Sequence, residues 1–557
     1  MSGQSDTPDM DGNPTDPYAR AAQIFPKLSE EMCARVAAYG TREALAADTL
    51  LFMRGDRSVD FFLVLAGAIE VFDTDEHGVS VVVARHEARQ FTGEIDLFND
   101  HAILVSGRAL RGTDVIRVKR PNFHRLVTGE PDIGEILMRA FILRRTGLIL
   151  HGQAGIILIG PAHSADTLRI QRFLTRNAYP HRVINSETDS GAGGMLEGFA
   201  VTPADLPVVL SHDKVLRRPN NAELADALGL TETLDPAHVH DVAIVGAGPA
   251  GLAAAVYAAS EGLETIVLES TAPGGQAGTS SKIENYLGFP TGISGQALAG
   301  RAQIQAQKFG ARLAISRNVT ALDCSERPFR LTLDDGQSVA ANAIVIATGA
   351  RYRKLSVPNY AKYEGQGIHY AATAMEGQLC GGEEVIVVGG GNSAGQAAVF
   401  LSRTTSHVHI LVRASGLVDT MSDYLVQRIE QSPRITLHAQ TEITALDGDE
   451  RLRQVTWTNR ATGAVETRAI GNIFLMIGAE PNTEWLGGCL ALDDKRFVLT
   501  GLDADGTRLA SPYATSKPGI FAVGDVRSGS VKRVASGVGE GSVVIQAVHH
   551  YLHPAEA

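Results

Sequence analysis

The 557-residue chain is too long for one hydrophobic core, and domains of ordinary size predict about three or four of them. Its formal net charge of −12 excludes a general nucleic-acid-binding or anionic-membrane-binding surface, because such surfaces need a basic field. No apolar run approaches the roughly 20 residues of a membrane span, and residues 1–20 are polar and proline-rich, unlike a signal peptide. We therefore expect a cytoplasmic protein with a disordered lead over residues 1–20 and with neither nucleic-acid nor membrane partners.

The four cysteines are widely separated, at Cys33, Cys324, Cys380 and Cys489. This spacing contains no CxxC pair and no zinc-knuckle pattern, and it predicts no disulfide framework. We accordingly expect no metal site.

Residues 21–148 start and finish with helical patterns and carry short hydrophobic runs between them. Glycines interrupt these runs, which predicts a β-roll, and residues 133–145 predict a closing helix. The interrupting glycines are Gly55, Gly67, Gly78 and Gly93. The segment resembles the cyclic-nucleotide-binding domain family in Gly55-Asp56, in the hairpin FFLVLAGAIEVF and in FTGEI.

The nucleotide-binding cassette of that family is incomplete in this chain. The resemblance implies that Glu94 would contact the ribose 2′-hydroxyl and that an arginine further along would pair with the cyclic phosphate. Ile103 and Leu104 stand where the arginine is expected, and Arg108 follows several residues later. A buried phosphate without a guanidinium partner is costly. We therefore expect a scaffold for dimerisation or domain packing, and a homodimer, rather than a cyclic nucleotide site.

Residues 152–230 predict a second unit of alternating strands and helices. AGIILIG reads as a buried strand, SADTLRIQRFLTRN as an amphipathic helix and HRVIN as a strand, and Pro207 precedes a third strand. This order resembles the thioredoxin/glutaredoxin fold, in which a cis proline occupies the position of Pro207. The redox motif of that fold would lie in GPAHSADT, which has no cysteine. Thiol chemistry needs a thiolate, so we expect a docking or spacer domain, followed by a polar linker over residues 231–240.

Residues 241–269 form a βαβ dinucleotide fingerprint. Gly246 permits a tight turn, Gly248 lets the backbone approach a pyrophosphate, and Gly251 lets the helix pack closely on the strand. Glu269 ends the second strand roughly 20 residues on, where a carboxylate accepts hydrogen bonds from ribose hydroxyls. The strand, the helix, the second strand and the terminal acid all occur in the order of this fingerprint, and together they predict a bound dinucleotide.

A second fingerprint begins at Glu383 and repeats the strand, the glycine turn and the helix. It carries Gly389, Gly391 and Ala394. Two fingerprints predict two dinucleotides, and a flavin with a nicotinamide is the pair that supports hydride transfer. Asp525 ends a later apolar strand beside a glycine, where it could accept a hydrogen bond from a ribitol hydroxyl.

Residues 241–552 resemble the low-molecular-weight thioredoxin reductase branch of the flavin disulfide reductases. The matching motifs include GAGPAG, GGQAGTSSKIENYLGFP, ATGAR, GGGNSA, IGAEPNTEWL and GDVRSGSVKRVASGVGEG. The resemblance implies interleaved Rossmann-like domains, with FAD on residues 241–355 and 478–557 and NAD(P)H on residues 356–477. It implies FAD contacts at Gly246, Gly248, Gly251, Glu269, Gly275, Gln276, Asn285, Val319, Gly349, Asp525, Arg533, Val534 and Ala535. It implies nicotinamide-nucleotide contacts at Gly389, Gly391, Asn392, Ser393, Ala394 and Arg413.

Two departures from that family affect the chemistry. Ala371 and Ala374 replace the redox cysteines, and Cys380 reads as a structural residue. His369 and Tyr370 are weak candidates for a proton donor near the flavin because they adjoin the replaced cysteines. At the 2′-phosphate position Arg413 is present without further cations, so NADPH is favoured and NADH is possible.

The sequence thus predicts a multidomain α/β and β protein that passes hydride from NADPH to FAD and then to an external acceptor. The acceptor would be a small molecule or a redox protein, because the internal CxxC relay is missing. A flavin-based sensor with the N-terminal domain as input is an alternative, and a thioredoxin-disulfide reductase is a second one. An intact nicotinamide site argues against the sensor, and the two alanines argue against the disulfide reductase.

Overall fold

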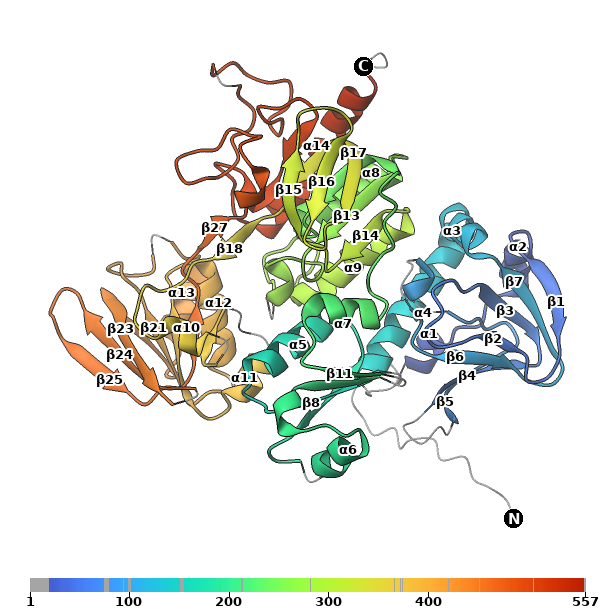
Figure 1. Cartoon of the computed structure of the whole chain (residues 1–557), viewed down its shortest axis with the longest axis horizontal. Helices are drawn as coiled ribbons and strands as arrows, with labels where there is room; N and C mark the ends of the chain where they lie inside the picture. The colour runs from blue at the N-terminus through green and yellow to red at the C-terminus, as the bar shows by residue number, and fades with distance from the viewer. Residues whose placement is uncertain are drawn as a thin grey trace.

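The computed structural model describes residues 20–74, 80–93, 95–98, 102–150, 155–189, 191–211, 214–280, 282–364, 366–370, 372, 374–418, 420–449, 451–503 and 505–554. Figure 1 shows a β-roll (blue), a thioredoxin-like unit (teal), a flavin-type unit (green, yellow and red) and a second dinucleotide-type unit (orange). The expected mixture of β and α/β folds is confirmed. Except for Arg20, the expected lead lies outside the described residues, and none of the described helices could span a membrane.

The β-roll consists of two antiparallel sheets with a helical base. One sheet has the order β1-β7-β3 and the other β2-β6-β4-β5. Aromatic rings fill its core, since Phe61 stacks on both Phe91 and Phe123 and Phe141 packs across them. The elements are α1 (Ala21–Ile24), α2 (Glu30–Ala37), β1 (Thr41–Leu45), β2 (Leu50–Phe52), β3 (Phe61–Ala66), β4 (Ala68–Thr74), β5 (Ser80–Glu87), η2 (Ile95–Phe98), β6 (Ser106–Ala109), β7 (Thr113–Val118), α3 (Arg120–Gly129) and α4 (Pro131–Leu150).

The thioredoxin-like unit has a sheet with the order β11-β10-β8-β9. The first two strands, β8 and β9, are parallel, and β10 runs antiparallel to both β8 and β11. The peptide bond before Pro207 is cis, as the resemblance implies, and β11 is a strand that the sequence did not predict. The elements are β8 (Ile156–Gly160), α5 (Ala165–Arg176), β9 (His181–Asn185), α6 (Ala192–Gly198), η3 (Pro203–Asp205), β10 (Val208–Ser211), β11 (Lys214–Arg217) and α7 (Asn221–Ala227).

The flavin-type unit, called the first half below, is built from two separate stretches of chain. Its sheet has the order β14-β13-β12-β17-β16-β15, and β28 from the C-terminal stretch pairs with β17. The helices α8 and α14 pack on one another over this sheet. The elements are β12 (Val239–Val245), α8 (Pro249–Ser260), β13 (Thr265–Glu269), η4 (Ala277–Thr279), α9 (Gly295–Lys308), β14 (Arg312–Ile315), β15 (Val319–Asp323), β16 (Phe329–Leu333), β17 (Ser338–Ile346), η5 (Glu484–Leu486), β28 (Ile520–Ala522), η6 (Gly524–Val526) and α14 (Val534–Leu552).

The remaining unit, called the second half below, is inserted between these stretches through the antiparallel pair β18 (Ala350–Tyr352) and β27 (Ala479–Pro481). Its parallel sheet has the order β19-β26-β20-β21-β22, and β23-β24-β25 form an antiparallel sheet beside it. The elements are α10 (Tyr360–Tyr363), β19 (Ile368–His369), α11 (Ala374–Leu379), β20 (Glu384–Val388), α12 (Asn392–Leu401), β21 (His407–Leu411), α13 (Asp423–Glu430), β22 (Ile435–His438), β23 (Thr441–Gly448), β24 (Leu452–Asn459), β25 (Val465–Arg468) and β26 (Ile473–Leu475).

The cysteines correct one expectation from the sequence. Cys324 and Cys489 form a disulfide across a sequence separation of 165 residues, whereas no disulfide framework was expected. Spacing along the chain could not reveal the pair, because it depends on folding that brings their Cα atoms to 6.2 Å. The bond joins the two stretches of the first half. Cys33 and Cys380 are free and buried.

Candidate dinucleotide sites

The first fingerprint has a backbone that tolerates only glycine at two points. Gly246 has a φ of +103°, and a Cβ on Gly251 would lie 1.9 Å from the carbonyl oxygen of Gly246. Gly248 is the N-cap of α8, so the unpaired N–H groups of the first helical turn face the turn that follows β12. The result is a close strand-to-helix turn with a bare backbone, which is suited to an anionic group.

Glu269 closes the end of this turn. Its side chain is 8% exposed, and its Oε2 accepts a hydrogen bond from the Ala247 N–H at 2.8 Å. Its Oε1 accepts from the Thr271 N–H at 3.0 Å. The following loop then returns to the fingerprint, because the Gly274 N–H donates to the Ala247 carbonyl at 2.7 Å. The carboxylate is therefore held at the carboxyl ends of β12 and β13.

The C-terminal stretch brings Asp525 to the same turn. A Cβ on Gly524 would lie 3.0 Å from the Cβ of Ala250, at the start of α8. The Gly524 N–H donates to the Glu540 carboxylate at 2.6 Å, and Glu540 also pairs with Arg527 at 2.8 Å. Burial raises the pKa of Asp525. These contacts fix a carboxyl group beside the fingerprint although it lies far along the chain.

The other residues that the resemblance implies for FAD differ in their exposure and in their contacts. Gly275 packs against Gly248, where an added Cβ would lie 3.1 Å from the Gly248 Cα. The Gln276 amide donates to the carbonyl of Ala350, the neighbour of Gly349. Asn285 is exposed, and Val319 begins β15 and is buried. Arg533 is the N-cap of α14, and Val534 and Ala535 form its first turn.

The second fingerprint repeats the same local geometry. Gly389 has a φ of +137°, and its Cβ would lie 2.2 Å from the carbonyl oxygen of Met476. Gly391 is the N-cap of α12. The Asn392 side-chain oxygen accepts from the Ser422 N–H at 2.7 Å, so it holds a neighbouring loop. Ala394 is fully buried against the sheet, whereas Ser393 is exposed.

The strand that follows the second fingerprint ends without an acid. Arg413 comes directly after Val412 at the carboxyl end of β21, and its side chain is exposed. Ala414 follows it, and Val418 is 73% exposed. An arginine in this place offers a planar pair of donors to a phosphate.

Both positions of the missing thiols carry alanine. Ala371 lies outside the described residues, and Ala374 begins α11. Cys380 is fully buried at the other end of that helix, and burial raises the pKa of its thiol to about 12. A thiol with so high a pKa is protonated at neutral pH and therefore unreactive.

His369 and Tyr370 are both engaged by neighbours. The two ring nitrogens of His369 bond Asn472 at 2.9 Å and Arg172 at 3.3 Å, and the ring stacks on Phe474. Burial lowers the pKa of His369, so it is a neutral imidazole. The Tyr370 hydroxyl donates to Glu364 at 2.5 Å, and burial raises its pKa.

Helix α5 of the thioredoxin-like unit contacts both halves, which the sequence did not predict. Arg172 pairs with the buried Glu376 at 3.1 Å, in the helix that starts at the missing thiols. One helical turn further, Arg176 donates to the Gly275 carbonyl at 3.0 Å, and Asn177 donates to the Thr271 carbonyl at 3.1 Å. The loop that adjoins the first fingerprint is thus covered by this helix.

The cysteine-free loop of the thioredoxin-like unit faces the second half. Its His163 and the His369 of β19 line one cavity of about 340 Å³, together with Glu383, Arg451 and Asn472. The cavity forms between two units that are far apart in the sequence, so no local sequence pattern could predict it.

In the β-roll cassette, apolar residues stand at the positions where the resemblance implies an arginine for the cyclic phosphate. Ile103 and Leu104 are buried apolar residues, and Arg108 is paired with Glu70 at 2.6 Å across the sheet. Glu94 lies outside the described residues.

Comparison with known proteins settles the family. Residues 240–541 match the model named pyridine nucleotide-disulphide oxidoreductase, which covers more than half of the chain. The chain belongs to this family. Residues 42–129 match the cyclic nucleotide-binding domain model, in agreement with the β-roll.

The family's thioredoxin reductase branch supplies the relatives. The chain is 34% identical over 313 residues to the thioredoxin reductase of Treponema pallidum, covering 56% of this chain and 97% of that protein. It is 32% identical over 315 residues to the enzyme of Chlamydia pneumoniae, with the same two coverages. The solved thioredoxin reductase of Lactococcus lactis is 30% identical, with a TM-score of 0.52 over 56% of this chain and 99% of that one. The thioredoxin reductase-like family binds FAD and NADPH.

Proposed function

We propose that the protein is an NADPH-dependent FAD oxidoreductase that delivers electrons to an external acceptor without an internal dithiol relay. The observation that carries the proposal is the combination of two glycine-built dinucleotide turns with alanines at both redox-cysteine positions. Of the two free cysteines, Cys380 is buried with a raised pKa and Cys33 lies buried in the β-roll.

The residues of the first half fit a bound FAD. The bare turn at Gly246 to Gly251 and the N-terminus of α8 would hold the pyrophosphate, and Glu269 would accept from the adenosine ribose. Asp525 would accept a hydrogen bond from a ribitol hydroxyl. The turn that carries Asp525 is held by the hydrogen bond from the Gly524 N–H to Glu540. We assign Gly275, Gln276, Asn285, Val319, Gly349, Arg533, Val534 and Ala535 to the same cofactor.

The residues of the second half fit NADPH. Gly389, Gly391, Asn392, Ser393 and Ala394 would cradle the pyrophosphate, and Arg413 would pair with the 2′-phosphate. The absence of an acid at the end of β21 removes the usual partner of an NAD ribose, so NADH is the poorer substrate. When both cofactors are bound, NADPH supplies a hydride to the flavin, which passes electrons on.

The missing relay decides which acceptors are possible. A small oxidant, a quinone or an iron–sulfur protein can take electrons at the flavin face without an enzyme thiol. Reduction of a partner disulfide through a Cys–Cys exchange on this chain is not possible, because exchange needs a reactive thiolate. We expect the working form to be a homodimer.

A second candidate function is favoured by the contacts of α5. Arg172 and Arg176 link the thioredoxin-like unit to both halves, so a change in the N-terminal units could alter the flavin environment. In that case the protein is a flavin-based sensor and turnover is incidental.

Anaerobic stopped-flow mixing with NADPH and then NADH tests the proposal. We expect rapid bleaching of the flavin by NADPH and slower bleaching by NADH, followed by reoxidation by one of the acceptors above. If neither nucleotide bleaches the bound flavin, the reductase function is wrong and the sensor is favoured.

A further inference from the structure

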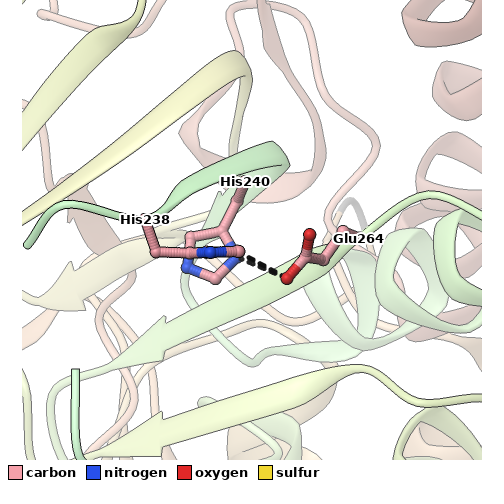
Figure 2. Close-up of side chains that lie close together, drawn as sticks. All are labelled: His238, His240 and Glu264. Atoms are coloured by element: carbon pink, nitrogen blue, oxygen red, sulfur yellow. Dashed lines mark hydrogen bonds and ion pairs between the residues drawn. The ribbon is translucent and has the colours of Figure 1, made fainter. Parts of the chain in front are cut away.

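Two histidines and a glutamate meet at the amino-terminal edge of the first half. His238 directly precedes β12, His240 lies within that strand, and Glu264 directly precedes β13. Residues two apart on a strand point to the same face. Figure 2 shows the two imidazole rings side by side, next to the Glu264 carboxylate. Both histidines fall within residues 231–240, for which the sequence predicts a polar linker, but β12 begins at Val239.

The potential ligand atoms lie close together. His238 Nε2 is 2.5 Å from Glu264 Oε1, and His240 Nδ1 is 4.0 Å from the same oxygen. All three atoms lie within 4.8 Å of one another. The ring centroids of the two histidines are 4.6 Å apart. The His238 Nε2 and Glu264 Oε1 atoms are hydrogen-bonded to each other, so a bound ion would replace this contact.

His240 has an unused nitrogen in this cluster. Its side chain is 4% exposed, and its Nδ1 is a buried atom without a hydrogen-bond partner. Burial chiefly lowers the pKa of His240 to about 4, so the ring is neutral at physiological pH. The Arg312 guanidinium also disfavours a charge on His240, and this guanidinium is itself paired with Glu232 at 2.7 Å. A buried polar nitrogen without a partner is costly.

The backbone holds the three side chains in position. The Glu264 N–H donates to the Asp241 carboxylate at 2.8 Å, and the Asp241 N–H donates back to the Glu264 carbonyl at 3.1 Å. Parallel pairing of β12 and β13 follows immediately, with Val242 opposite Thr265. The cluster is therefore fixed by the sheet, while the partial exposure of His238 and Glu264 leaves it accessible to an ion.

A second histidine cluster in the chain shows the difference between occupied and free nitrogens. In the second half, His409 bonds His438 at 3.0 Å through one nitrogen and Glu384 at 3.2 Å through the other. His407 bonds Thr436 at 2.8 Å. These rings satisfy one another, so this cluster offers no comparable free lone pair at His409.

We propose that His238, His240 and Glu264 bind a divalent transition-metal ion of the Zn²⁺ class. Two imidazoles and a carboxylate are a common ligand set for Zn²⁺, with water as a fourth ligand. Tetrahedral ligands at 2.0–2.2 Å from the metal lie about 3.3 Å apart. The observed separations of 2.5 Å, 4.0 Å and at most 4.8 Å bracket this value, so metal binding requires the side chains to rotate. No metal site was expected from the sequence.

The position of this site indicates a structural role. It lies about 20 Å along β12 from the first fingerprint, at the opposite end of the strand. His238 is also where the chain enters the first half from the thioredoxin-like unit, and its N–H donates to Asp235. A bound ion would fix this entry to the edge of the sheet, and it would take no part in hydride transfer.

Metal binding by the full-length flavoprotein tests the proposal. The protein is freed of metal with a chelator, titrated with Zn²⁺ by calorimetry, and then analysed for retained metal after gel filtration. We expect one equivalent of tightly bound Zn²⁺ and a higher Tm. His238→Gln and Glu264→Gln are partly exposed substitutions that should fold, and each should weaken binding at least tenfold.

His407→Gln is the matched control, because it removes a histidine from the other cluster and should leave Zn²⁺ affinity unchanged. The rate of flavin reduction by NADPH should be the same in all these variants. The proposal is overturned if no Zn²⁺ is retained by the folded protein, or if the retained Zn²⁺ is unaffected by His238→Gln and Glu264→Gln. Loss of Zn²⁺ in His407→Gln alone would assign the metal to the other cluster and would also overturn it.

Discussion

The first half and the second half use the same glycine turn but differ in how firmly their parts are joined. In the first half, Glu269 and the Asp525 turn from the C-terminal stretch lie against the fingerprint, and a disulfide joins the two stretches of chain. In the second half, the strand after the fingerprint ends at the exposed Arg413, and the unit is attached through β18 and β27. This difference suits a cofactor that stays bound and a nucleotide that exchanges at every turnover.

The largest effect should follow from Gly251→Val in the first half. The new Cβ would lie 1.9 Å from the Gly246 carbonyl oxygen, so the start of α8 would have to move away from the turn. We expect the purified variant to be colourless, as measured by the ratio of flavin to protein absorbance. Gly300→Ala is the control, because that helical glycine has open space around it and should keep full flavin content.

A change at the first glycine of the second fingerprint should separate the two sites. Gly389→Ala places a Cβ 2.2 Å from the Met476 carbonyl oxygen, in a backbone conformation that favours glycine. We expect full FAD content and a reduction rate with NADPH that is slower by about a hundredfold, as for a misplaced substrate. Gly416→Ala, in open space near Arg413, should change neither quantity. Loss of FAD in Gly389→Ala would contradict the separation.

The disulfide should matter for the stability of the first half only. Removal by Cys324→Ser should lower its stability by about 2–4 kcal/mol, because the bond closes a long loop in the unfolded chain. Hydrogen exchange of β15 and η5 should increase, while exchange in β20 and β21 should not. Titration of the unfolded wild-type protein should give two thiols before reduction and four after it. Four thiols before reduction would mean that the bond is not formed.

Removing the contact between α5 and the second half should lower stability by less than removing the disulfide. Arg172→Ala leaves the buried Glu376 without this partner, and since Arg172 is one-third exposed we expect a cost of about 1–2 kcal/mol. Hydrogen exchange of α5 and α11 should increase together. Arg169→Ala is the control, because Arg169 bonds Asp166 and Asn221 within its own unit. An unchanged α11 in Arg172→Ala would show that the two units are not coupled there.

The smallest effect should come from Arg413→Ala. Loss of one charge-assisted contact at an exposed position should raise the KM for NADPH about tenfold, with little change in the KM for NADH. Steady-state kinetics with both nucleotides measure this difference. Equal effects on both nucleotides would show that Arg413 does not bind the 2′-phosphate.

Local chemistry explains which features could be predicted. The two fingerprints could be predicted because Gly246 and Gly389 are required by the backbone of a tight turn, which involves only a few neighbouring residues. The β-roll and the cis proline at Pro207 were likewise expected from short patterns and family resemblance. The assigned cofactor contacts stay predictions, of which Gly251, Gly389 and Arg413 are tested by the variants above.

The features that were missed depend on distant parts of the chain. The Cys324–Cys489 bond, the Arg172–Glu376 pair and the His238–Glu264 cluster each join segments that no periodicity relates. Their residue types are unremarkable in sequence, since isolated cysteines, arginines and histidines usually lie in ordinary surroundings. Only the folded arrangement gives each of them a partner.

The pairing of β18 with β27 shows how the second half belongs to the chain. Ala350 lies opposite Pro481 and Tyr352 opposite Ala479, so the chain leaves the first half and returns to it at neighbouring points. Adjacent strands are about 5 Å apart, a gap that a short turn can close. The second half is therefore an insertion whose two ends lie next to each other, so the chain could be closed without it. A different nucleotide-binding unit could be grafted between these strands without cutting the sheet that holds the flavin-type turn.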